Sequence, residues 1–246
     1  MTRGYLSEIF ISFQGEGACA GRRHLFIRLG GCNLRCRYCD TPDSLQRGTG
    51  YRVFSPAGGA RAVPNPVTTA AVLADVHSLL DADQETVDGV ALTGGEPLTQ
   101  ADFLAELLAD GGLPRPRLLE TNGMLPESLP AVLPFIEIVS MDIKLPSNSG
   151  ERAFWAQHAR FLALARGKAY VKVLIDAETN LAEVARAASL VSDTAPEAPL
   201  FLQPITAADG RVSISAAALQ RFFAAARRSL NDVRVLPQTH KMLAIQ

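Results

Sequence analysis

Three cysteines, Cys32, Cys36 and Cys39, stand within eight residues of one another. Thiolates at this density hold a metal or form disulfides, and their spacing has to distinguish the two. A structural zinc site needs four ligands, usually as two separated Cys-x-x-Cys pairs, and the chain has a single further cysteine, Cys19. Three thiolates on an iron-sulfur cube leave one iron free to bind something other than protein. The spacing thus favours reaction chemistry, with a zinc loop completed by Cys19 or three unconnected buried thiols as the alternatives.

The composition is that of one domain with a sizeable core. The chain has 246 residues, 48% of them hydrophobic and 20% charged, so it should fold without disulfides. A net charge of -1 gives no overall basic field, and we expect neither nucleic acid nor an anionic membrane as a partner. No apolar run has the length of a signal peptide or a membrane span. Together with free cysteines, this predicts the reducing cytoplasm.

Apolar runs and amphipathic stretches alternate along the chain and predict an α/β fold. Strands are expected at residues 5–13, 24–30, 87–92, 117–119, 136–141, 169–175, 200–202 and 233–236. Helices are expected after a cap at Thr68 or Thr69 and at residues 101–109, 151–166, 180–191 and 215–230. This alternation implies right-handed crossovers, a parallel sheet and helices outside it. Roughly six strands of this kind fall short of a closed eight-fold barrel, so we expect an open, partial (β/α)6 barrel.

Unusual polar groups follow the carboxyl ends of the predicted strands. Thr93 and Glu96 follow one strand, Glu120 follows the next, and Asp142 and Lys144 follow a third. The carboxyl ends of parallel strands share one face, where the active sites of barrels sit. These side chains should therefore surround one site together with the cysteine loop.

Residues 42–66 are rich in Gly, Pro, Ser and Arg and show no periodic pattern. Loops of this length are uncommon without a function. We therefore expect a single domain over residues 1–246, with an insertion loop at 43–67 that covers the site or stays partly mobile. A linker between two domains is the weaker interpretation, because the segment before it is too short to fold alone.

The spacing C-x3-C-x2-C, with Tyr38 just before the last cysteine, resembles the cluster loop of the radical S-adenosylmethionine enzymes. In that family three cysteines hold a [4Fe-4S] cluster whose open iron binds S-adenosylmethionine, and one electron cleaves this cosubstrate to a 5'-deoxyadenosyl radical. The resemblance implies that Cys32, Cys36 and Cys39 are the cluster ligands. It also implies a partial barrel, in agreement with the strand pattern.

The stretch Gly94-Gly95-Glu96 resembles the glycine-rich motif with which this family binds the methionine part of the cosubstrate. Glycines expose backbone groups, and a carboxylate accepts hydrogen bonds from an ammonium group. On its own the motif could be a strand-end turn, and the later polar residues could be an exposed ion pair. The resemblance implies the following cosubstrate-binding residues: Tyr38, Cys39, Asp40, Gly94, Gly95, Glu96, Ser140, Asp142 and Lys144.

Three further stretches together resemble one family within this group, the 7-carboxy-7-deazaguanine synthases. They are Phe-Gln-Gly-Glu-Gly at residues 13–17, Asp-Thr at 40–41 and Val-Leu-Pro-Gln-Thr-His-Lys at 235–241. The resemblance implies a carbon–nitrogen lyase of queuosine and 7-deazapurine biosynthesis. Its reaction is a Mg2+-dependent ring contraction of 6-carboxy-5,6,7,8-tetrahydropterin to 7-carboxy-7-deazaguanine, with release of ammonia. An electron donor such as flavodoxin or ferredoxin and a homodimer are implied as well.

The same resemblance implies roles for individual residues. It assigns substrate binding to Phe13, Gln14, Gly15, Glu16, Arg28, Thr93 and His240, catalysis to Glu16, Glu120 and His240, and Mg2+ binding to Thr41. A carboxylate and backbone groups match the donors and acceptors of a pterin edge, and an arginine can pair bidentately with the substrate carboxylate. Magnesium keeps few protein ligands, so one threonine hydroxyl could suffice. A threonine that only caps the loop is the alternative.

A glycyl-radical activating enzyme is the nearest competing interpretation, because it shares the cysteine spacing. Its substrate is a glycine in another protein, which requires an open groove and no arginine that clamps a carboxylate. A noncatalytic zinc module is the alternative from a different class. Iron and sulfide analysis separates that module from both enzymes.

Overall fold

Within residues 2–83, 85–207 and 209–245, which the computed structural model describes, one ten-stranded sheet forms the centre of the molecule. Its strand order is β12-β11-β10-β9-β8-β7-β3-β2-β4-β5. The strands are β2 (Leu6–Phe13), β3 (Arg23–Leu29), β4 (Gly50–Phe54), β5 (Ala60–Pro64), β7 (Gly89–Gly94), β8 (Arg117–Thr121), β9 (Ile138–Asp142), β10 (Ala169–Ile175), β11 (Leu200–Pro204) and β12 (Val233–Val235). A separate small pair joins β1 (Arg3–Gly4) to β6 (Val67–Thr68).

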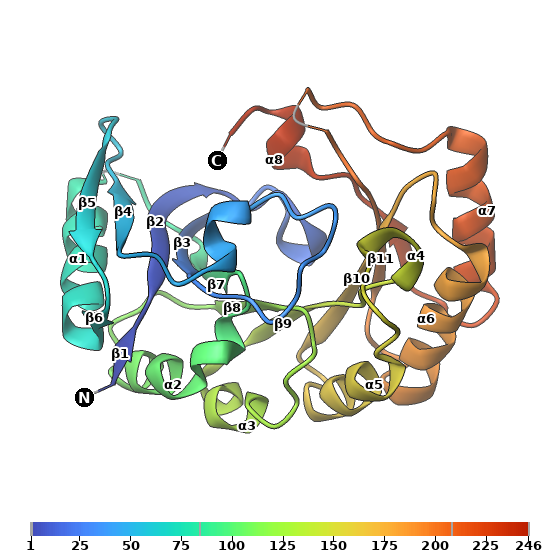
Figure 1. The fold of residues 1–246 in the computed structure, drawn as a ribbon, viewed down its shortest axis with the longest axis horizontal. Helices are drawn as coiled ribbons and strands as arrows, with labels where there is room; N and C mark the ends of the chain where they lie inside the picture. Colours follow the sequence, from blue (N-terminus) through green and yellow to red (C-terminus); the bar gives the residue numbers. More distant parts are fainter. Residues whose placement is uncertain (1, 84, 208, 246) are drawn as a thin grey trace.

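Helices cover the outer side of this sheet. Figure 1 shows α2, α3, α5, α6 and α7 along the lower and right-hand rim, while α8 lies at the top. The helices are α1 (Thr69–Ala82), α2 (Ala101–Ala109), α3 (Leu129–Val132), α4 (Pro146–Ser149), α5 (Trp155–Leu164), α6 (Leu181–Thr194), α7 (Ala216–Arg227) and α8 (Thr239–Met242), with 3-10 turns η1 (Gly17–Cys19), η2 (Pro42–Leu45), η3 (Pro97–Gln100) and η4 (Leu133–Phe135). The side chain of Thr68 caps α1 by accepting from the N–H of Ala71, as the sequence predicted.

The sheet is mainly parallel and open. β3 and the strands from β7 to β12 run in one direction, whereas β2 is antiparallel to β3. The consecutive residues His24, Leu25, Phe26 and Ile27 of β3 are all buried, as expected for a strand covered on both faces. Because the strand order ends at β12 and at β5, the sheet does not close on itself. The predicted α/β class, with a parallel sheet in an open, partial barrel and helices outside, is confirmed.

The segment predicted to be an insertion loop contains a β-hairpin. β4 and β5 pair antiparallel, and β4 joins the sheet by lying parallel to β2. Tyr51 and Val53 of β4 are buried, whereas Arg52 between them is exposed. The prediction of an aperiodic segment is therefore wrong. The sequence did not reveal the hairpin, because an alternation this short does not stand out among glycines and prolines.

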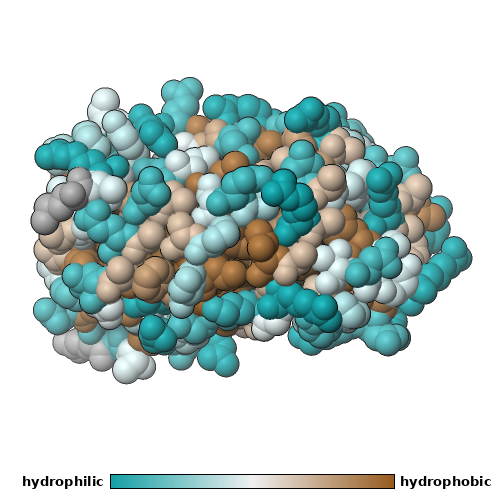
Figure 2. Space-filling model, turned by 90° about the horizontal axis from the view of Figure 1, so that it is seen from below, coloured by the Kyte–Doolittle hydropathy of each residue, from teal (hydrophilic) through white to brown (hydrophobic). Residues whose placement is uncertain are grey.

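The face of the molecule seen from below is mostly hydrophilic (Figure 2). Seen from below, hydrophilic side chains surround an apolar band near the middle of the face (Figure 2). None of the helices in the described part of the chain is both long and apolar enough to cross a membrane.

The helix predicted at residues 151–166 begins only at Trp155 and ends at Leu164. Glu151 instead accepts a hydrogen bond from the backbone N–H of Arg35 in the cysteine loop.

Candidate active site

One cavity lies where the carboxyl ends of the parallel strands meet the cysteine loop and the C-terminal segment. The predicted residues that line it are Phe13, Gln14, Gly15, Glu16, Arg28, Cys32, Cys36, Tyr38, Cys39, Asp40, Thr41, Thr93, Gly94, Gly95, Glu120, Asp142, Lys144 and His240. Two predicted residues, Glu96 and Ser140, do not line the cavity. The fold therefore gathers the predicted cluster, cosubstrate and substrate residues around a common space.

Backbone hydrogen bonds hold the cysteine loop on two sides. The N–H of Gly31 donates to the carbonyl oxygen of Ser44 at 2.8 Å, and the N–H of Arg37 donates to that of Ser149 at 2.9 Å. Ser44 belongs to η2, and Ser149 ends α4. The loop that carries the three cysteines is thus anchored both to the segment that follows it directly and to one far beyond it in the chain.

The three loop cysteines fit a [4Fe-4S] cluster in which one iron has no protein ligand. Burial raises the pKa of the Cys32 and Cys36 thiols, so these groups hold protons that metal binding would release. The N–H of Leu34 is directed at Sγ of Cys32, 3.4 Å away, and such contacts tune cluster sulfurs. Cys19 is buried in an apolar cluster with Phe10 and does not line the cavity. This arrangement does not support a zinc site completed by Cys19.

Two glycines let β7 end directly against the cysteine loop. Gly94 has a φ of 140°, and a Cβ at this position would lie 2.1 Å from the carbonyl oxygen of Leu29. A Cβ at Gly95 would lie 2.4 Å from the carbonyl oxygen of Gly31. A side chain at Gly94 would collide with the end of β3 and one at Gly95 with the cysteine loop, so packing by itself requires glycine at both.

Glu96 lies behind the cavity wall and braces it. Its carboxylate accepts hydrogen bonds from the N–H of Asn122 at 2.8 Å and from the hydroxyl of Thr121 at 2.9 Å. The side-chain amide of Asn122 in turn donates to Oδ1 of Asn33 in the cysteine loop at 2.8 Å. Burial raises the pKa of Glu96 to about 7, although the hydrogen bonds that its carboxylate accepts act in the opposite direction and lower the pKa. The geometry shows a bracing contact for Glu96, while its predicted contact with the cosubstrate stays a prediction.

A lysine that the sequence did not single out, Lys172, connects Glu16 on one side of the site to Asp142 on the other. Lys172 of β10 is 3% exposed, and its Nζ contacts the carboxylates of Glu16 and, at 3.4 Å, Asp142. Nζ of Lys144 lies 2.8 Å from the other oxygen of Asp142. Burial would lower the pKa of Lys172, but the charges of Asp142 and Glu16 raise it well above its ordinary value. The sequence does contain a signal for this residue: Lys172 is the single charged residue in the otherwise apolar strand β10, and a buried lysine needs a partner.

Glu16 is held as a carboxylate by groups from distant parts of the chain. Burial would raise the pKa of Glu16, but the Lys172 ammonium and hydrogen bonds from Lys172 and Gln238 hold it well below its usual range. Nε2 of the buried Gln238 donates to Glu16 at 2.8 Å and to Asp40 at 3.0 Å. Nζ of Lys241 lies 3.1 Å from the same oxygen of Asp40. Glu16 can therefore accept hydrogen bonds from a ligand but carries no proton to donate near neutral pH.

Other predicted substrate residues are paired within the cavity wall. Nε2 of Gln14 donates to Oε1 of Glu120 at 2.7 Å. Arg28, for which the resemblance implies a contact with the substrate carboxylate, is paired with another residue of the protein. Its Nε lies 3.3 Å from Oε2 of Glu8, and its side chain also lines the cavity. Glu8 was not foreseen as the partner, because strand pairing is what brings it beside Arg28.

The hydroxyl of Thr41 is available for a metal ion. Thr41 occupies the position before η2, but its side chain makes no capping hydrogen bond, so the alternative role as a cap is not supported. Ligand-type atoms of Glu16, Asp40 and His240, which line the same cavity, lie within 4.8 Å of one another. The two carboxylates offer the oxygen ligands that suit Mg2+, whereas His240 would offer a ring nitrogen. In this arrangement Gln238 already occupies oxygens of both carboxylates.

Comparison with known proteins agrees with this site. Residues 26–184 match the family model of the Radical SAM superfamily. The chain is 37% identical to the 7-carboxy-7-deazaguanine synthase of Geobacter sulfurreducens, over 97% of this chain and 96% of that protein. It is 34% identical to the protein of the same name from Methanopyrus kandleri, over 96% and 92% of the two chains.

Two solved structures share the fold. The crystal structure of QueE from Escherichia coli matches with a TM-score of 0.56 at 20% identity, covering 96% of this chain and 94% of that one. A radical SAM methyltransferase from Sphaerobacter thermophilus matches with a TM-score of 0.56 at 14% identity, covering 94% and 77%. At these identities the two structures support the architecture alone.

Proposed function

Because the chain belongs to the radical S-adenosylmethionine superfamily and, within it, to the family of the 7-carboxy-7-deazaguanine synthases, we propose that it forms 7-carboxy-7-deazaguanine. The proposed substrate is 6-carboxy-5,6,7,8-tetrahydropterin, whose ring contracts with loss of ammonia in a Mg2+-dependent reaction. The observation that carries this proposal is the cavity in which the cysteine loop faces Glu16, Arg28 and Glu120. Such an arrangement holds two reactants next to each other, which is what a radical transfer between them needs.

The residues of the chain divide into two groups around the cavity. When bound, the cluster and S-adenosylmethionine supply a one-electron, hydrogen-abstracting chemistry. Cys32, Cys36 and Cys39 would hold the cluster, and the ion pair of Lys144 with Asp142 offers both charges to the zwitterionic, ribose-bearing cosubstrate.

The second group recognises the pterin. Glu16 is ionised and accepts hydrogen bonds from the amide and amino edge of the pterin ring. Arg28 pairs through its terminal nitrogens with the substrate carboxylate, since its contact with Glu8 uses Nε. His240 closes the cavity from the C-terminal segment. The proposal gives Glu120 and Thr93 the remaining contacts to the ring.

Further parts of the proposal concern partners. Thr41 ligates Mg2+ through its hydroxyl, together with oxygens of the substrate and water. A protein of the flavodoxin or ferredoxin type supplies the electron. We propose that the enzyme works as a homodimer in the cytoplasm, where its thiols stay reduced.

Anaerobic turnover tests the proposal. The reconstituted protein is incubated with reductant, S-adenosylmethionine, Mg2+ and 6-carboxy-5,6,7,8-tetrahydropterin, and the product and ammonia are quantified by mass spectrometry and an ammonia assay. We expect 7-carboxy-7-deazaguanine and ammonia in equal amounts, with no product from Cys36→Ala. Cosubstrate cleavage without pterin turnover, together with radical formation on a partner protein, would instead indicate an activating enzyme.

A further inference from the structure

A row of three charged side chains connects the hairpin of β4 and β5 to the cavity. Glu8 of β2 lies opposite Arg28 of β3 on one side and opposite Arg52 of β4 on the other. Oε2 of Glu8 is 3.3 Å from Nε of Arg28, and Oε1 forms an ion pair with Nη2 of Arg52. The two arginines therefore share one carboxylate, each holding a different oxygen.

Aromatic rings keep both guanidinium groups in place. Cζ of Arg28 lies 5.5 Å from the ring centroid of Phe10, and Cζ of Arg52 lies 5.0 Å from that of Phe54. The rings of Phe10 and Phe54 meet edge to face, with centroids 6.4 Å apart. The charged row spans β3, β2 and β4, and the aromatic pair lies across two of these strands, β2 and β4, where its rings contact both guanidinium groups.

Only one of the two arginines reaches the cavity. Arg28 lines it and is largely shielded from solvent, whereas Arg52 does not line it and has a side chain that is 54% exposed. Glu8, with a side chain only 12% exposed, competes with any anionic ligand for Arg28. Two positive charges and one negative charge leave the row with one net positive charge, which matches a ligand with one carboxylate.

We propose that Arg52 controls how strongly the cavity binds a carboxylate. By holding one oxygen of Glu8, Arg52 prevents that carboxylate from engaging Arg28 with both oxygens, and so keeps the Arg28 guanidinium available to the ligand. Arg52 is a positioning residue, because it acts through Glu8 and touches no ligand itself. The inference rests on the proposed function for the identity of the ligand, a carboxylated pterin, and gives the hairpin a role in substrate selection.

Two ligands that differ in one carboxylate test this inference. Dissociation constants of 6-carboxypterin and of pterin are measured anaerobically on the full chain with its cluster and S-adenosylmethionine. Arg52→Ala should weaken 6-carboxypterin binding roughly three- to five-fold, the range of a partly exposed ion pair, and leave pterin binding unchanged. Arg52→Lys should restore most of the preference for the carboxylated ligand, because it keeps the charge.

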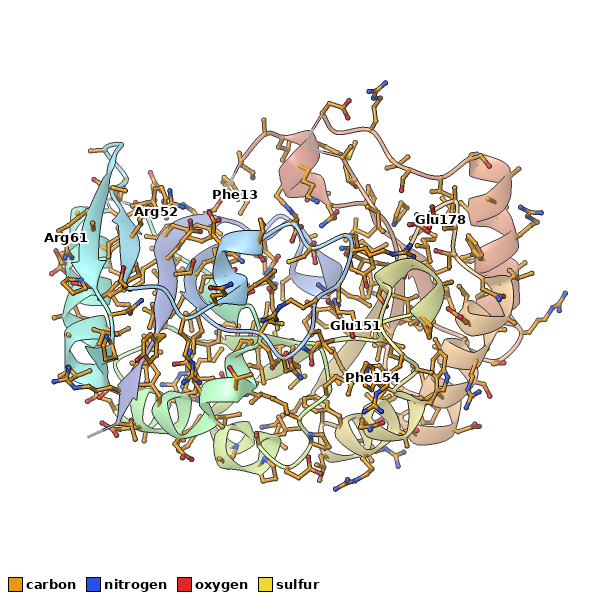
Figure 3. All side chains as sticks on the ribbon, viewed as in Figure 1. Phe13, Arg52, Arg61, Glu151, Phe154 and Glu178 are labelled. Carbon is orange, nitrogen blue, oxygen red and sulfur yellow. The ribbon has the colours of Figure 1, made fainter. Side chains whose placement is uncertain are left out.

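The hairpin offers a matched control. Arg61 of β5 is as exposed as Arg52, with side-chain exposures of 56% and 54%, but it pairs with Asp75. Figure 3 shows Arg61 farther out toward the edge of the molecule than Arg52. Arg61→Ala should therefore leave the affinities for both pterins unchanged.

A second variant separates the mechanism from general damage. In a Glu8→Gln background no carboxylate competes for Arg28, so adding Arg52→Ala should have no effect on 6-carboxypterin binding. An equal loss of affinity for both pterins, or an effect of Arg52→Ala that persists in the Glu8→Gln background, overturns the inference. If the unmodified chain does not prefer 6-carboxypterin to pterin, the proposed carboxylate site fails first. If it prefers 6-carboxypterin and Arg52→Ala keeps that preference, only the role of Arg52 fails.

Discussion

Gly15 and His240 come from opposite ends of the chain and lie in direct contact at the cavity wall. A Cβ at position 15 would stand 2.1 Å from Nδ1 of His240, closer than non-bonded atoms can approach. The N–H of Thr239 also donates to the carbonyl oxygen of Gly15 at 3.0 Å. The C-terminal segment is thus seated on a backbone surface that only glycine provides.

Replacing this glycine should damage substrate binding. Gly15→Ala must displace His240, and a shift of about 1 Å at a site that positions a substrate can cost up to roughly 100-fold in rate. We expect kcat/KM for the pterin to fall at least about ten-fold, as measured by initial rates. Gly48→Ala is the control, since a Cβ there meets only one atom, at 3.5 Å. Equal rates for Gly15→Ala and Gly48→Ala would contradict the contact with His240.

Lys172 should contribute to stability as well as to the site. Lys172→Met leaves the buried carboxylate of Glu16 without its cation, which should lower the free energy of unfolding by about 3 kcal/mol in urea titrations. Lys168→Met is the control, because its Nζ donates to the carbonyl oxygens of Leu133 and Ile136; about 1 kcal/mol is expected there. Adding Glu16→Gln to Lys172→Met should recover part of the loss, and a further loss would argue against the pairing.

The cysteines divide into ligands and a matched control. Cys32→Ala, Cys36→Ala and Cys39→Ala should each lose most of the iron, which should be about four atoms per chain in the unmodified protein. Cys19→Ala should keep it, because Cys19 lies in an apolar cluster away from the cavity. Iron and sulfide analysis after anaerobic reconstitution measures both. Full iron in any of the three loop variants would refute the ligand assignment.

Thr41 should determine the response to magnesium. Thr41→Ala removes the hydroxyl, and the Mg2+ concentration for half-maximal activity should rise at least about ten-fold. Thr41→Ser keeps the hydroxyl and should behave like the unmodified protein. A Mg2+ titration of turnover compares the three proteins. An unchanged half-maximal concentration in Thr41→Ala would move the metal ligand to another residue.

His158 should make the folded protein sensitive to acid. Its side chain is fully buried, with Nε2 3.2 Å from the carbonyl oxygen of Asn122, and burial lowers its pKa to about 4, from 6.5 in an unfolded chain. Between these two pH values the unfolded chain binds a proton that the folded chain does not. The free energy of unfolding should therefore fall as the pH drops from 6.5 to 4, by up to about 3 kcal/mol.

A neutral variant isolates the contribution of His158. His158→Gln can still donate to the carbonyl oxygen of Asn122 but does not titrate, so its stability should depend less on pH. Urea titrations at pH 7.5 and pH 5 compare the two proteins. A stability difference between them that is the same at both pH values would rule out this ionisation.

Local patterns in the sequence determined most of what lies at the strand ends. Cys32, Cys36 and Cys39 are neighbours in the chain, so their spacing alone places three thiols in one loop. The glycine pair at 94–95 follows a strand by sequence, and any parallel sheet brings that strand end to the same face. These signals are short-ranged, and no knowledge of packing is needed to find them.

Only the tertiary structure decided which side chains meet across the sheet. Lys172 pairs with Glu16, and Gln238 with Asp40, because the fold brings together segments that lie far apart in the chain. Glu96 turned out to be shielded behind the wall because the end of β8 packs over it. The charge and burial of a side chain depend on what packs against it, and the sequence around that side chain does not contain this information.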